Sequence, residues 1–409
     1  MDLKITPTLL SGEVTVPPSK SAAHRMIIAA GLARGTSTIF NLSGSADILA
    51  TIGCMKAFGA DIELNGNTAV IHGITSAPSS AVADCCESGS TLRFLIPVAC
   101  ALGINAEFHG NGKLPQRPIT PFLEEFPKHG VSFDFSNAEN SASLPCSVSG
   151  KLTAGRFEID GGISSQFITG LMFALPLLNG DSEIVLRSRL ESKPYIDITM
   201  GVLRDFGCEI IERDNGYSIK GNTRLKPFSG SVEGDYSQSA FFYVANALGS
   251  HIEIGGLNKS SFQGDKKIVE ICNEFSKNSA PFELDCSDIP DLVPILSVLG
   301  CFCKGTSRLY NAARLRIKEC DRLAAMEDCL NKIGGKISST KDSLIIEGVE
   351  SFSGGEVVCY NDHRIAMSMA VAATRCSSPL IIRGAECVRK SYPDFFDVYK
   401  SIGGKVTEI

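Results

Sequence analysis

Asp291 and Glu319 are the acidic residues of this chain whose surroundings suit proton transfer. Asp291 follows Pro290 at the expected start of a helix. Glu319 lies next to Lys318 and close to Arg322. A carboxylate among positive charges stays ionised unless it is buried, so both residues are candidate proton acceptors or donors. The alternative is structural: Asp291 would complement a helix dipole, and Glu319 would only pair with a neighbouring cation.

Basic residues recur in short strings that are rich in Gly, Ser, Pro and Asp. A basic residue at a helix start opposes the helix dipole, so helix propensity does not explain this pattern. An anion held at those helix starts would explain it. Eight such residues lie close to the junctions of a repeated unit: Lys20, Arg25, Arg93, Arg117, Lys318, Arg322, Arg364 and Lys390. A single arginine of this kind is typically a solvated surface residue, but eight at equivalent places predict a site for small, multiply negative ligands.

The composition argues against several other functions. The chain of 409 residues has 39 Lys and Arg against 45 Asp and Glu, and its net charge of −6 argues against a nucleic-acid surface. No apolar stretch is long enough to span a bilayer, so no membrane partner is expected. The 15 cysteines are scattered without CxxC spacing, which predicts reduced thiols in the cytoplasm and no zinc site. Neither a P-loop nor a GxGxxG string is present, so a nucleotide is not indicated.

The chain repeats a pattern in which a helix ends at glycine and leads into a strand. The pattern recurs at intervals of roughly 70 residues, with one interval close to twice that, as in a repeat architecture. Six copies of a βαβαββ module would account for this spacing. In each copy an apolar helix follows the first strand, and an amphipathic helix follows the second. The expected apolar helices are Met26–Ala33, Leu92–Leu102, Phe167–Leu178, Ala240–Leu248, Leu292–Phe302 and Ile365–Ala373.

Six modules predict two lobes of three, with a break near Phe228–Gly234. There Ser231–Glu233 is expected to be the first strand of the second lobe. The apolar helices should be buried at the centre of each lobe, and the amphipathic helices should lie outside. The turns before the apolar helices would then meet at one end of each lobe and face a shared cleft. Four residues of these turns are plausible N-caps: Ser21, Ser90, Ser165 and Asp362.

Seven strings of this chain together resemble the EPSP synthase family, the 3-phosphoshikimate 1-carboxyvinyltransferases. In chain order they are 17–25, 117–119, 164–167, 192–195, 315–322, 361–364 and 390–394. The match runs from residue 13 to about residue 400, and seven strings in the right order are far more specific than any one. The resemblance implies an α/β fold of two inside-out barrels with three βαβαββ units each. The lobes would be residues 18–229 and residues 1–17 plus 230–409, with the active site in the cleft between them.

The resemblance also implies a reaction. An enzyme of this kind joins phosphoenolpyruvate (PEP) to the 5-hydroxyl of shikimate 3-phosphate and releases phosphate, a step of the shikimate pathway to aromatic amino acids. It needs no metal and no organic cofactor. Glyphosate is expected to compete with PEP, and we expect a cytoplasmic monomer.

Carried over position by position, the resemblance implies three catalytic residues. Glu319 would give a proton to the methylene carbon of PEP, Asp291 would accept one from the attacking hydroxyl, and Lys20 would assist proton movement at the phosphate. The implied shikimate 3-phosphate site consists of Lys20, Ser21, Arg25, Ser164, Ser165, Gln166, Ser192, Tyr195, Asp291 and Lys318. The implied PEP site consists of Lys20, Gly89, Arg117, Gln166, Arg322, Arg364 and Lys390.

Within these sites the resemblance divides the residues by the group they bind. Ser21 and Arg25 correspond to ligands of the shikimate carboxylate. The hydroxyls at the sugar phosphate are those of Ser164, Ser165 and Ser192. Arg322 and Arg364 correspond to a clamp on the PEP carboxylate, a role that suits the forked guanidinium group.

Three positions depart from the family pattern, and two other functions compete. Glu87 stands where the family commonly has Asn, Phe94 where many members have Pro, and Arg314 where some members have Asn, which affects loop detail and inhibitor sensitivity. The related UDP-N-acetylglucosamine carboxyvinyltransferases carry a reactive cysteine on the loop that corresponds to Gly110–Arg117, and this chain has no Cys there. A non-enzymatic ring of repeated α/β units would leave the acidic and basic residues above without a role.

Overall fold

The computed structural model describes residues 1–135 and 144–409. The chain forms two compact units. We call residues 18–233 the continuous unit, and residues 1–17 with 234–409 the split unit. Among the described helices, none is both long and apolar enough to cross a membrane.

The continuous unit contains three four-stranded sheets that share one strand order. In each, the first two strands are parallel, the third strand is antiparallel to the second, and the fourth is antiparallel to the third. Two of these sheets are β6 (Ser80–Asp84), β7 (Asn105–His109), β9 (Cys146–Gly150), β8 (Val131–Asp134) and β10 (Arg156–Ile159), β11 (Ser182–Leu186), β13 (Gly216–Ile219), β12 (Ile210–Arg213). This is the strand pattern of the predicted βαβαββ module.

The remaining sheet of the continuous unit corrects one prediction. Its strands are β14 (Ser229–Ser231), β3 (Thr36–Phe40), β5 (Thr68–His72) and β4 (Asp61–Asn65). β14 runs parallel to β3, so it completes this sheet and is not the first strand of the second lobe. The pairing continues past the strand, because Val232 N donates to Phe40 O at 3.0 Å and Ser19 N donates to Glu233 O at 2.7 Å.

The split unit repeats the pattern twice and then departs from it. Its two four-stranded sheets are β16 (Glu283–Asp285), β17 (Thr306–Tyr310), β19 (Leu344–Glu347), β18 (Lys336–Ser339) and β20 (Gly355–Val358), β21 (Leu380–Arg383), β1 (Leu3–Thr6), β22 (Lys405–Glu408). The last sheet pairs only β2 (Ser11–Thr15) with β15 (His251–Gly255) among the described residues. The expectation that every copy closes with two strands is therefore wrong for this module, because the chain passes from the helix Lys267–Asn278 directly to β16, which pairs with β17. The N-terminal strand β1 lies between β21 and β22.

Burial separates two classes of helix, as the hydrophobic pattern predicted. The apolar helices are α1 (Lys20–Leu32), α3 (Gly89–Leu102), α5 (Ser165–Ala174), α7 (Tyr236–Ala247), α9 (Val293–Gly300) and α11 (His363–Ala372). All eight residues of α9 and all ten of α11 are buried. The outer helices are α2 (Ala46–Ala57), α4 (Thr120–Glu125), α6 (Lys193–Asp205), α8 (Lys267–Asn278), α10 (Arg322–Lys332) and α12 (Phe395–Ser401). Only four of the twelve residues of α8 are buried, so its polar face meets solvent.

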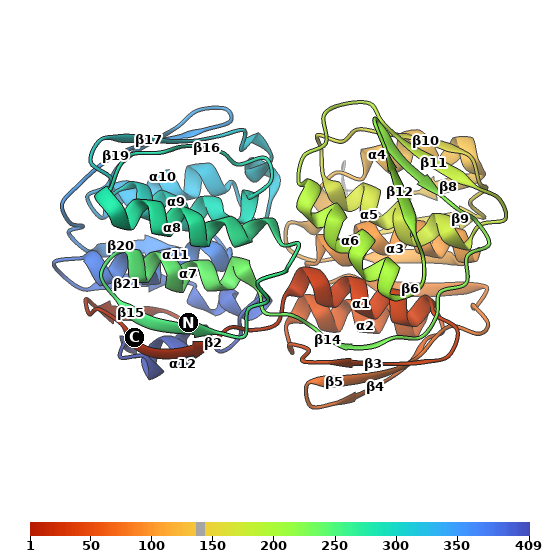
Figure 1. Ribbon diagram of the computed structural model, residues 1–409, viewed down its shortest axis with the longest axis horizontal. Coiled ribbons are helices and arrows are strands. Elements are labelled where there is room, and N and C mark those ends of the chain that lie inside the picture. Colours follow the sequence, from red (N-terminus) through yellow and green to blue (C-terminus); the bar gives the residue numbers. More distant parts are fainter. Residues whose placement is uncertain (136–143) are drawn as a thin grey trace. The chain divides into compact units, whose positions relative to one another are not determined.

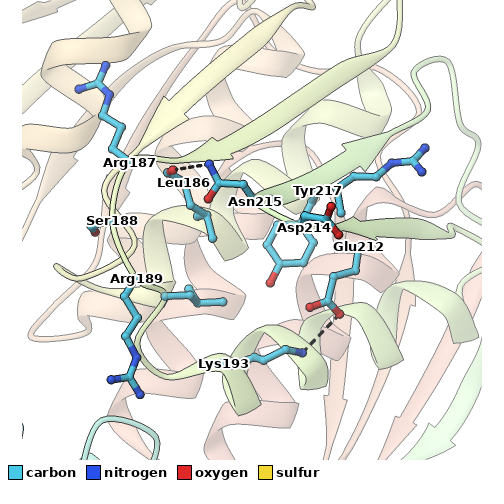
Figure 2. Close-up of a pocket in the computed structure, with 12 residues that line it drawn as sticks. Leu186, Arg187, Ser188, Arg189, Lys193, Glu212, Asp214, Asn215 and Tyr217 are labelled. Atoms are coloured by element: carbon cyan, nitrogen blue, oxygen red, sulfur yellow. Dashed lines mark hydrogen bonds and ion pairs between the residues drawn. The ribbon is translucent and has the colours of Figure 1, made fainter.

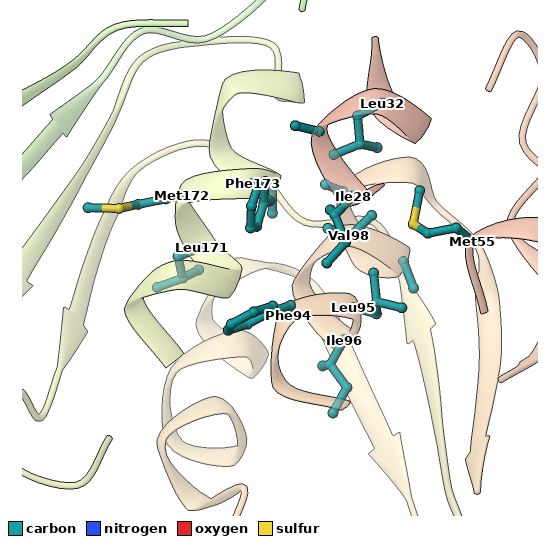
Figure 3. Packing of buried hydrophobic residues seen from close by; sticks show 14 of the residues in the cluster. Ile28, Leu32, Met55, Phe94, Leu95, Ile96, Val98, Leu171, Met172 and Phe173 are labelled. Atoms are coloured by element: carbon teal, nitrogen blue, oxygen red, sulfur yellow. The ribbon is translucent and has the colours of Figure 1, made fainter. Parts of the chain in front are cut away.

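The buried helices pack on one another inside each unit. In the split unit α7, α9 and α11 are in mutual contact, and Figure 1 shows them between the strands of that unit. In the continuous unit α3 packs on α5, and Figure 3 shows Phe94 and Val98 of α3 beside Phe173 of α5 and Ile28 of α1. These apolar contacts fix the helix axes, and the axes in turn fix the positions of the residues at the helix starts.

Five of the six buried helices begin earlier than the apolar runs predicted, whereas α9 begins one residue later, at Val293. The basic strings therefore form the first turns of α1 and α11. α1 begins at Lys20 and α11 at His363. Asp362 caps α11 as expected. Three of the predicted caps are wrong, because the capping side chains are those of Ser19, Ser88 and Ser164 instead of Ser21, Ser90 and Ser165. The capping serine is the one with extended backbone before the helix, which leaves the other three inside the first turn.

Candidate active site

The predicted site residues fall into two groups, one in each unit. The continuous unit contributes helix starts and the loops before them. The split unit contributes the residues around Asp291 and Arg322.

Arg25 is a buried cation whose hydrogen-bond partners are neutral groups. Its residue is 2% exposed. The guanidinium donates to the Thr199 hydroxyl at 2.7 Å and to the carbonyls of Ser21 and Tyr195 at 2.7 and 3.0 Å. It also lies 5.0 Å from the ring centroid of Phe94. Within residues 1–135 and 144–409, no carboxylate forms an ion pair with Arg25, and burial lowers its pKa to about 9. A buried guanidinium that stays protonated at neutral pH is a strong attractor for an anionic ligand.

Gln166 joins the starts of α3 and α5. Its Nε2 donates to Ser90 Oγ at 2.9 Å, and its Oε1 accepts from Arg93 Nη1 at 2.7 Å. Gly89 lies against the guanidinium of Arg117, because a Cβ at Gly89 would be 2.8 Å from Arg117 Nη1 and 2.9 Å from its Cζ. A side chain at Gly89 would therefore displace Arg117.

Lys20 meets an acidic partner that sequence reasoning missed. Its Nζ lies 2.6 Å from Asp47 Oδ2, and the two side chains are 21% and 14% exposed. Asp47 belongs to the first turn of α2, where an acidic residue is ordinary and carries no special signal. The ion pair holds the ammonium group at the start of α1.

The predicted phosphate-binding serines occupy the starts of α5 and α6. Ser164 caps α5, and its hydroxyl accepts from the Gln166 backbone N–H at 3.3 Å. Ser165 follows inside the first turn and is 5% exposed. Ser192 precedes α6 with a left-handed φ of 60°, and its side chain makes no capping hydrogen bond. A non-glycine residue held in this conformation costs free energy, which is typical of functional sites.

Arg322 is the centre of the acidic and basic cluster of the split unit. Its residue is 2% exposed. Its Nε lies 2.7 Å from Asp362 Oδ2, its Nη2 lies 2.8 Å from Glu319 Oε2, and its Nη1 lies 3.1 Å from Asp291 Oδ1. Contacts with three carboxylates hold the Arg322 guanidinium in one orientation.

Arg364 holds the other side of Asp291. Its Nη2 lies 2.9 Å from Asp291 Oδ2, and its Nη1 donates to the Asp291 carbonyl at 3.1 Å. The loop before α11 also receives Lys390, whose Nζ donates to Asn361 O at 2.9 Å. Lys318 ends the short 3-10 helix Ala313–Ile317, and its charge acts on the Asp291 carboxyl. The structure thus groups all six predicted residues of this unit.

Positive charge holds Asp291 ionised. Burial alone would raise the pKa of its carboxyl, but the charges of Arg364, Lys318 and Arg322 outweigh burial and hold the pKa far below its usual range. Burial likewise tends to lower the pKa of Arg322, and the carboxylates of its partners raise it well above the usual value. In this arrangement Asp291 is a weak base, because its two guanidinium partners stabilise the charged form.

Sequence reasoning missed several supporting residues. Asp362 was predicted only as a helix cap, yet it is fully buried and pairs with Arg322. The hydroxyls of Thr199 and Thr169 accept hydrogen bonds from the Arg25 guanidinium, and the two hydroxyls lie within hydrogen-bond distance of each other. Helix spacing contains a signal for both, since Thr199 lies one turn after Tyr195 and Thr169 one turn after Ser165.

The three departures from the family pattern have definite surroundings. Phe94 is 1% exposed and supports the Arg25 guanidinium, and its ring also meets that of His24 edge-on at 6.4 Å. Glu87 packs against Gly112. Arg314 Nη2 donates to the Ser287 carbonyl.

A hollow elsewhere in the continuous unit is separate from these residues. Figure 2 shows it between the end of β11, the start of α6 and the hairpin of β12 and β13. Lys193, which follows Ser192, lines it and lies 3.4 Å from Glu212. None of the predicted site residues lines this hollow. In the part of the chain that the structure describes, no group of three or more His, Cys, Asp or Glu residues is arranged to hold a metal ion.

Comparisons with known proteins agree on one family. The family model described as EPSP synthase (3-phosphoshikimate 1-carboxyvinyltransferase) matches residues 5–399. Proteins named 3-phosphoshikimate 1-carboxyvinyltransferase from Clostridium perfringens and Clostridium beijerinckii are each 44% identical to this chain, over 420 and 433 residues. The alignments cover 98% and 100% of this chain and 98% of each relative. A solved EPSP synthase from Acinetobacter baumannii superposes with a TM-score of 0.83 and 25% identity, covering all of both chains.

Proposed function

Because the chain belongs to the EPSP synthase family and transfers the carboxyvinyl group of PEP to shikimate 3-phosphate, we propose that the two residue groups described above bind these substrates. The observation that carries the proposal is the contrast between the groups. Arg25 is buried among neutral oxygens and ready for an external anion. Arg322 and Arg364 converge on one carboxylate, that of Asp291.

Shikimate 3-phosphate uses the continuous unit. Its carboxylate pairs with Arg25 and the Ser21 hydroxyl, because a buried guanidinium gains most from a charged acceptor. Its phosphate accepts hydrogen bonds at the starts of α5 and α6, where helix N-termini favour negative charge. The residues in this second role are Ser164, Ser165, Gln166, Ser192 and Tyr195, with Lys318 of the split unit.

PEP uses cations from both units. Its carboxylate takes the place of the Asp291 side chain on Arg322 and Arg364, since the same fork that holds one carboxylate can hold another. Its phosphate is bound by Lys20, Gln166, Arg117 and Lys390, and Gly89 leaves the space that the Arg117 guanidinium needs.

When the PEP carboxylate replaces that of Asp291 on the two arginines, Asp291 becomes a stronger base. Once PEP holds Arg322 and Arg364, the charges that depress the pKa of Asp291 are neutralised and its basicity rises. Asp291 then accepts the proton of the 5-hydroxyl while that oxygen bonds to C2 of PEP. Glu319 gives a proton to C3, which forms a tetrahedral intermediate. The methyl group afterwards returns a proton to Glu319 as the C2–O bond to phosphate breaks, and Lys20 stabilises the departing phosphate.

A phosphate-release assay with different acceptors tests the substrate. We expect phosphate release from PEP with shikimate 3-phosphate and none with UDP-N-acetylglucosamine. Release with the nucleotide sugar alone would contradict the proposal.

The inhibitor, the oligomeric state and the compartment are also proposed. Glyphosate carries a phosphonate and a carboxylate, so it should raise the KM for PEP without lowering the maximal rate. The enzyme should sediment as a monomer. All 15 cysteines are free thiols and most are buried, which supports a reducing cytoplasm.

A further inference from the structure

Two buried threonines of the continuous unit belong to a hydrogen-bond chain that the proposed mechanism does not use. Thr51 lies in α2 and Thr91 in α3, and both residues are fully buried. Their hydroxyl oxygens are 2.7 Å apart. At one end of the chain, Thr51 Oγ1 lies 2.7 Å from Nδ1 of the buried His24 in α1. At the other end, the Thr91 hydroxyl donates to Ser88 Oγ at 2.7 Å. The chain therefore connects three helices.

The contact with His24 lies one turn beyond the ion pair of Lys20 with Asp47. His24 is four residues after Lys20 in α1, and Thr51 is likewise four residues into α2 from the acidic partner. Residues four apart share one face of a helix, so the two contacts join the same faces of α1 and α2. The carbonyl oxygen of Asp47 also lies 3.4 Å from the Thr51 hydroxyl and 3.5 Å from that of Thr91. Both threonines thus hold the residue whose carboxylate contacts the Lys20 ammonium group.

The other end of the chain fixes the start of α3. Ser88 caps this helix, and its hydroxyl oxygen accepts from the Thr91 backbone N–H at 3.1 Å. A capping serine by itself fixes only its own helix. Because the Thr91 hydroxyl also contacts Thr51, the start of α3 is held to α2 as well. Gly89 follows the cap directly and lies against the Arg117 guanidinium.

Stability alone does not explain this chain. The Nε2 atom of His24 is buried and has no hydrogen-bond partner among the described residues. A buried polar atom without a partner costs free energy, and apolar side chains of the same shape could fill this space at little or no cost. Burial, together with the charges of Lys20 and Arg25, lowers the pKa of His24 well below its usual value. The imidazole is therefore neutral at the pH of the assays below, and the chain does not change with pH there.

We propose that Thr51 and Thr91 are positioning residues that hold the Lys20 ammonium group and the start of α3 in place for the PEP phosphate. The inference rests on the proposed function, because that function assigns Lys20 to this phosphate and, beside Gly89, Arg117. Without the two hydroxyls, the helices still pack through apolar contacts, but the cations are less well ordered. PEP binding must then order them, which weakens it.

Thr91→Val tests the proposal, since Val keeps the branched shape of Thr and lacks the hydroxyl. Both KM values and kcat are measured at pH 7.5 for the wild-type enzyme, Thr91→Val and Thr91→Ser. We expect Thr91→Val to raise the KM for PEP on the order of tenfold, about the value of one hydrogen bond, and Thr91→Ser to restore it. The kcat and the KM for shikimate 3-phosphate should change by less than about threefold, because most of the proposed contacts of that substrate lie elsewhere.

Thr374→Val is the matched control. The Thr374 side chain is buried in the split unit, and its hydroxyl donates within its own turn, to Val371 O at 2.7 Å. This variant loses a hydroxyl of the same kind without touching the chain described above. We expect its KM values and its kcat to equal those of the wild type.

Asp47→Ala shows whether the effect reaches Lys20 through the ion pair. In this background the ammonium group has lost the carboxylate that the threonines hold in place. Thr51→Val should therefore raise the KM for PEP on the order of tenfold in the wild-type background and by less than about twofold in Asp47→Ala. Equal factors in the two backgrounds would overturn the proposal, because a purely structural pair acts independently of Asp47.

Two further outcomes would also overturn the inference and leave the proposed function intact. One is a wild-type KM for PEP in both Thr51→Val and Thr91→Val, with both variants folded by circular dichroism. The other is that neither variant folds, which would assign the hydroxyl pair to stability. Absence of any turnover of PEP and shikimate 3-phosphate by the wild-type enzyme would instead overturn both.

Discussion

At the scale of single residues, the site depends on which carboxylate the arginines hold. Asp291 contacts Arg322 and Arg364 through different oxygens, at 3.1 and 2.9 Å. These contacts stabilise the ionised side chain and make it a poor proton acceptor until another anion replaces it. In the proposed function, substrate binding and base activation are therefore coupled through two guanidinium groups.

Asp291→Asn should separate these two effects. We expect kcat to fall by about 10²- to 10⁴-fold, the usual contribution of a positioned base. The KM for PEP should fall several-fold, because a neutral amide competes less for Arg364. Glu319→Gln is the comparison: it should also lower kcat, but Asp291 remains on Arg364, so the KM for PEP should change less. A variant Asp291→Asn with a raised KM for PEP would contradict the exchange of carboxylates.

The ion pairs of Asp291 also predict a pH dependence of stability. The pKa of this group is lowered in the folded state, so its contribution is complete above the unfolded pKa of about 4 and is lost as the pH falls below it. Urea unfolding of wild type and Asp291→Asn between pH 3 and 7 checks this. The wild type should be more stable above pH ~4 by about 1–3 kcal/mol, with a smaller difference at pH 3. A difference that is independent of pH would argue against the ion pairs.

Gly89→Ala tests the contact with Arg117. The new Cβ would lie 2.8 Å from Arg117 Nη1, at the end of a flexible side chain, so the guanidinium should move without unfolding the protein. We expect the KM for PEP to rise on the order of tenfold, with little change in kcat if ground-state and transition-state binding are lost equally. Gly53→Ala is the matched control, because a Cβ there meets nothing within 4 Å. Equal KM values for the two variants would remove Gly89 from the account.

At the scale of elements, many of the proposed site residues lie at helix starts, and the buried helices position them. The sequence indicated the apolar helices and their approximate order, because their hydrophobic runs are long and continuous. The sequence placed three N-caps one or two residues too late. Strings such as Ser19-Lys20-Ser21 contain two serines, and only the backbone geometry decides which of them caps the helix. The contact of Asp47 was not predicted, because an acidic residue in the first turn of a helix is ordinary. The contact of Thr169 was also missed, although its position one turn after Ser165 contained the signal.

Asp362 joins two elements and should be costly to lose. It caps α11 and pairs with the buried Arg322 of α10. Asp362→Asn should lower the free energy of unfolding by about 3–5 kcal/mol, since it leaves a buried guanidinium with fewer charged partners. Asp328→Asn removes an ion pair between exposed side chains, with Lys332, and should cost less than about 1 kcal/mol. Urea unfolding measures both, and equal losses would show that Asp362 is not a structural centre.

At the scale of the whole molecule, the chain passes twice from one unit to the other. Each passage follows a first strand, after β2 and after β14, so two modules obtain that strand from distant parts of the chain. Strand pairing over such a distance leaves no local signature, which is why the sequence assigned β14 to the wrong module. The sixfold repeat and the two classes of helix were predictable, because they depend on periodicity alone, but the missing closing strands of the module with β2 and β15 were not.

The central claim is that Arg25 binds shikimate 3-phosphate and that Arg364 binds PEP. One initial-rate experiment tests it. Both substrates are varied for wild type, Arg25→Met and Arg364→Met, with the surface variant Arg156→Met as control. We predict that Arg25→Met raises the KM for shikimate 3-phosphate by about 10²-fold and Arg364→Met raises mainly the KM for PEP, as expected for loss of a charged partner. Wild-type KM values for shikimate 3-phosphate in Arg25→Met, or for PEP in Arg364→Met, would contradict the account.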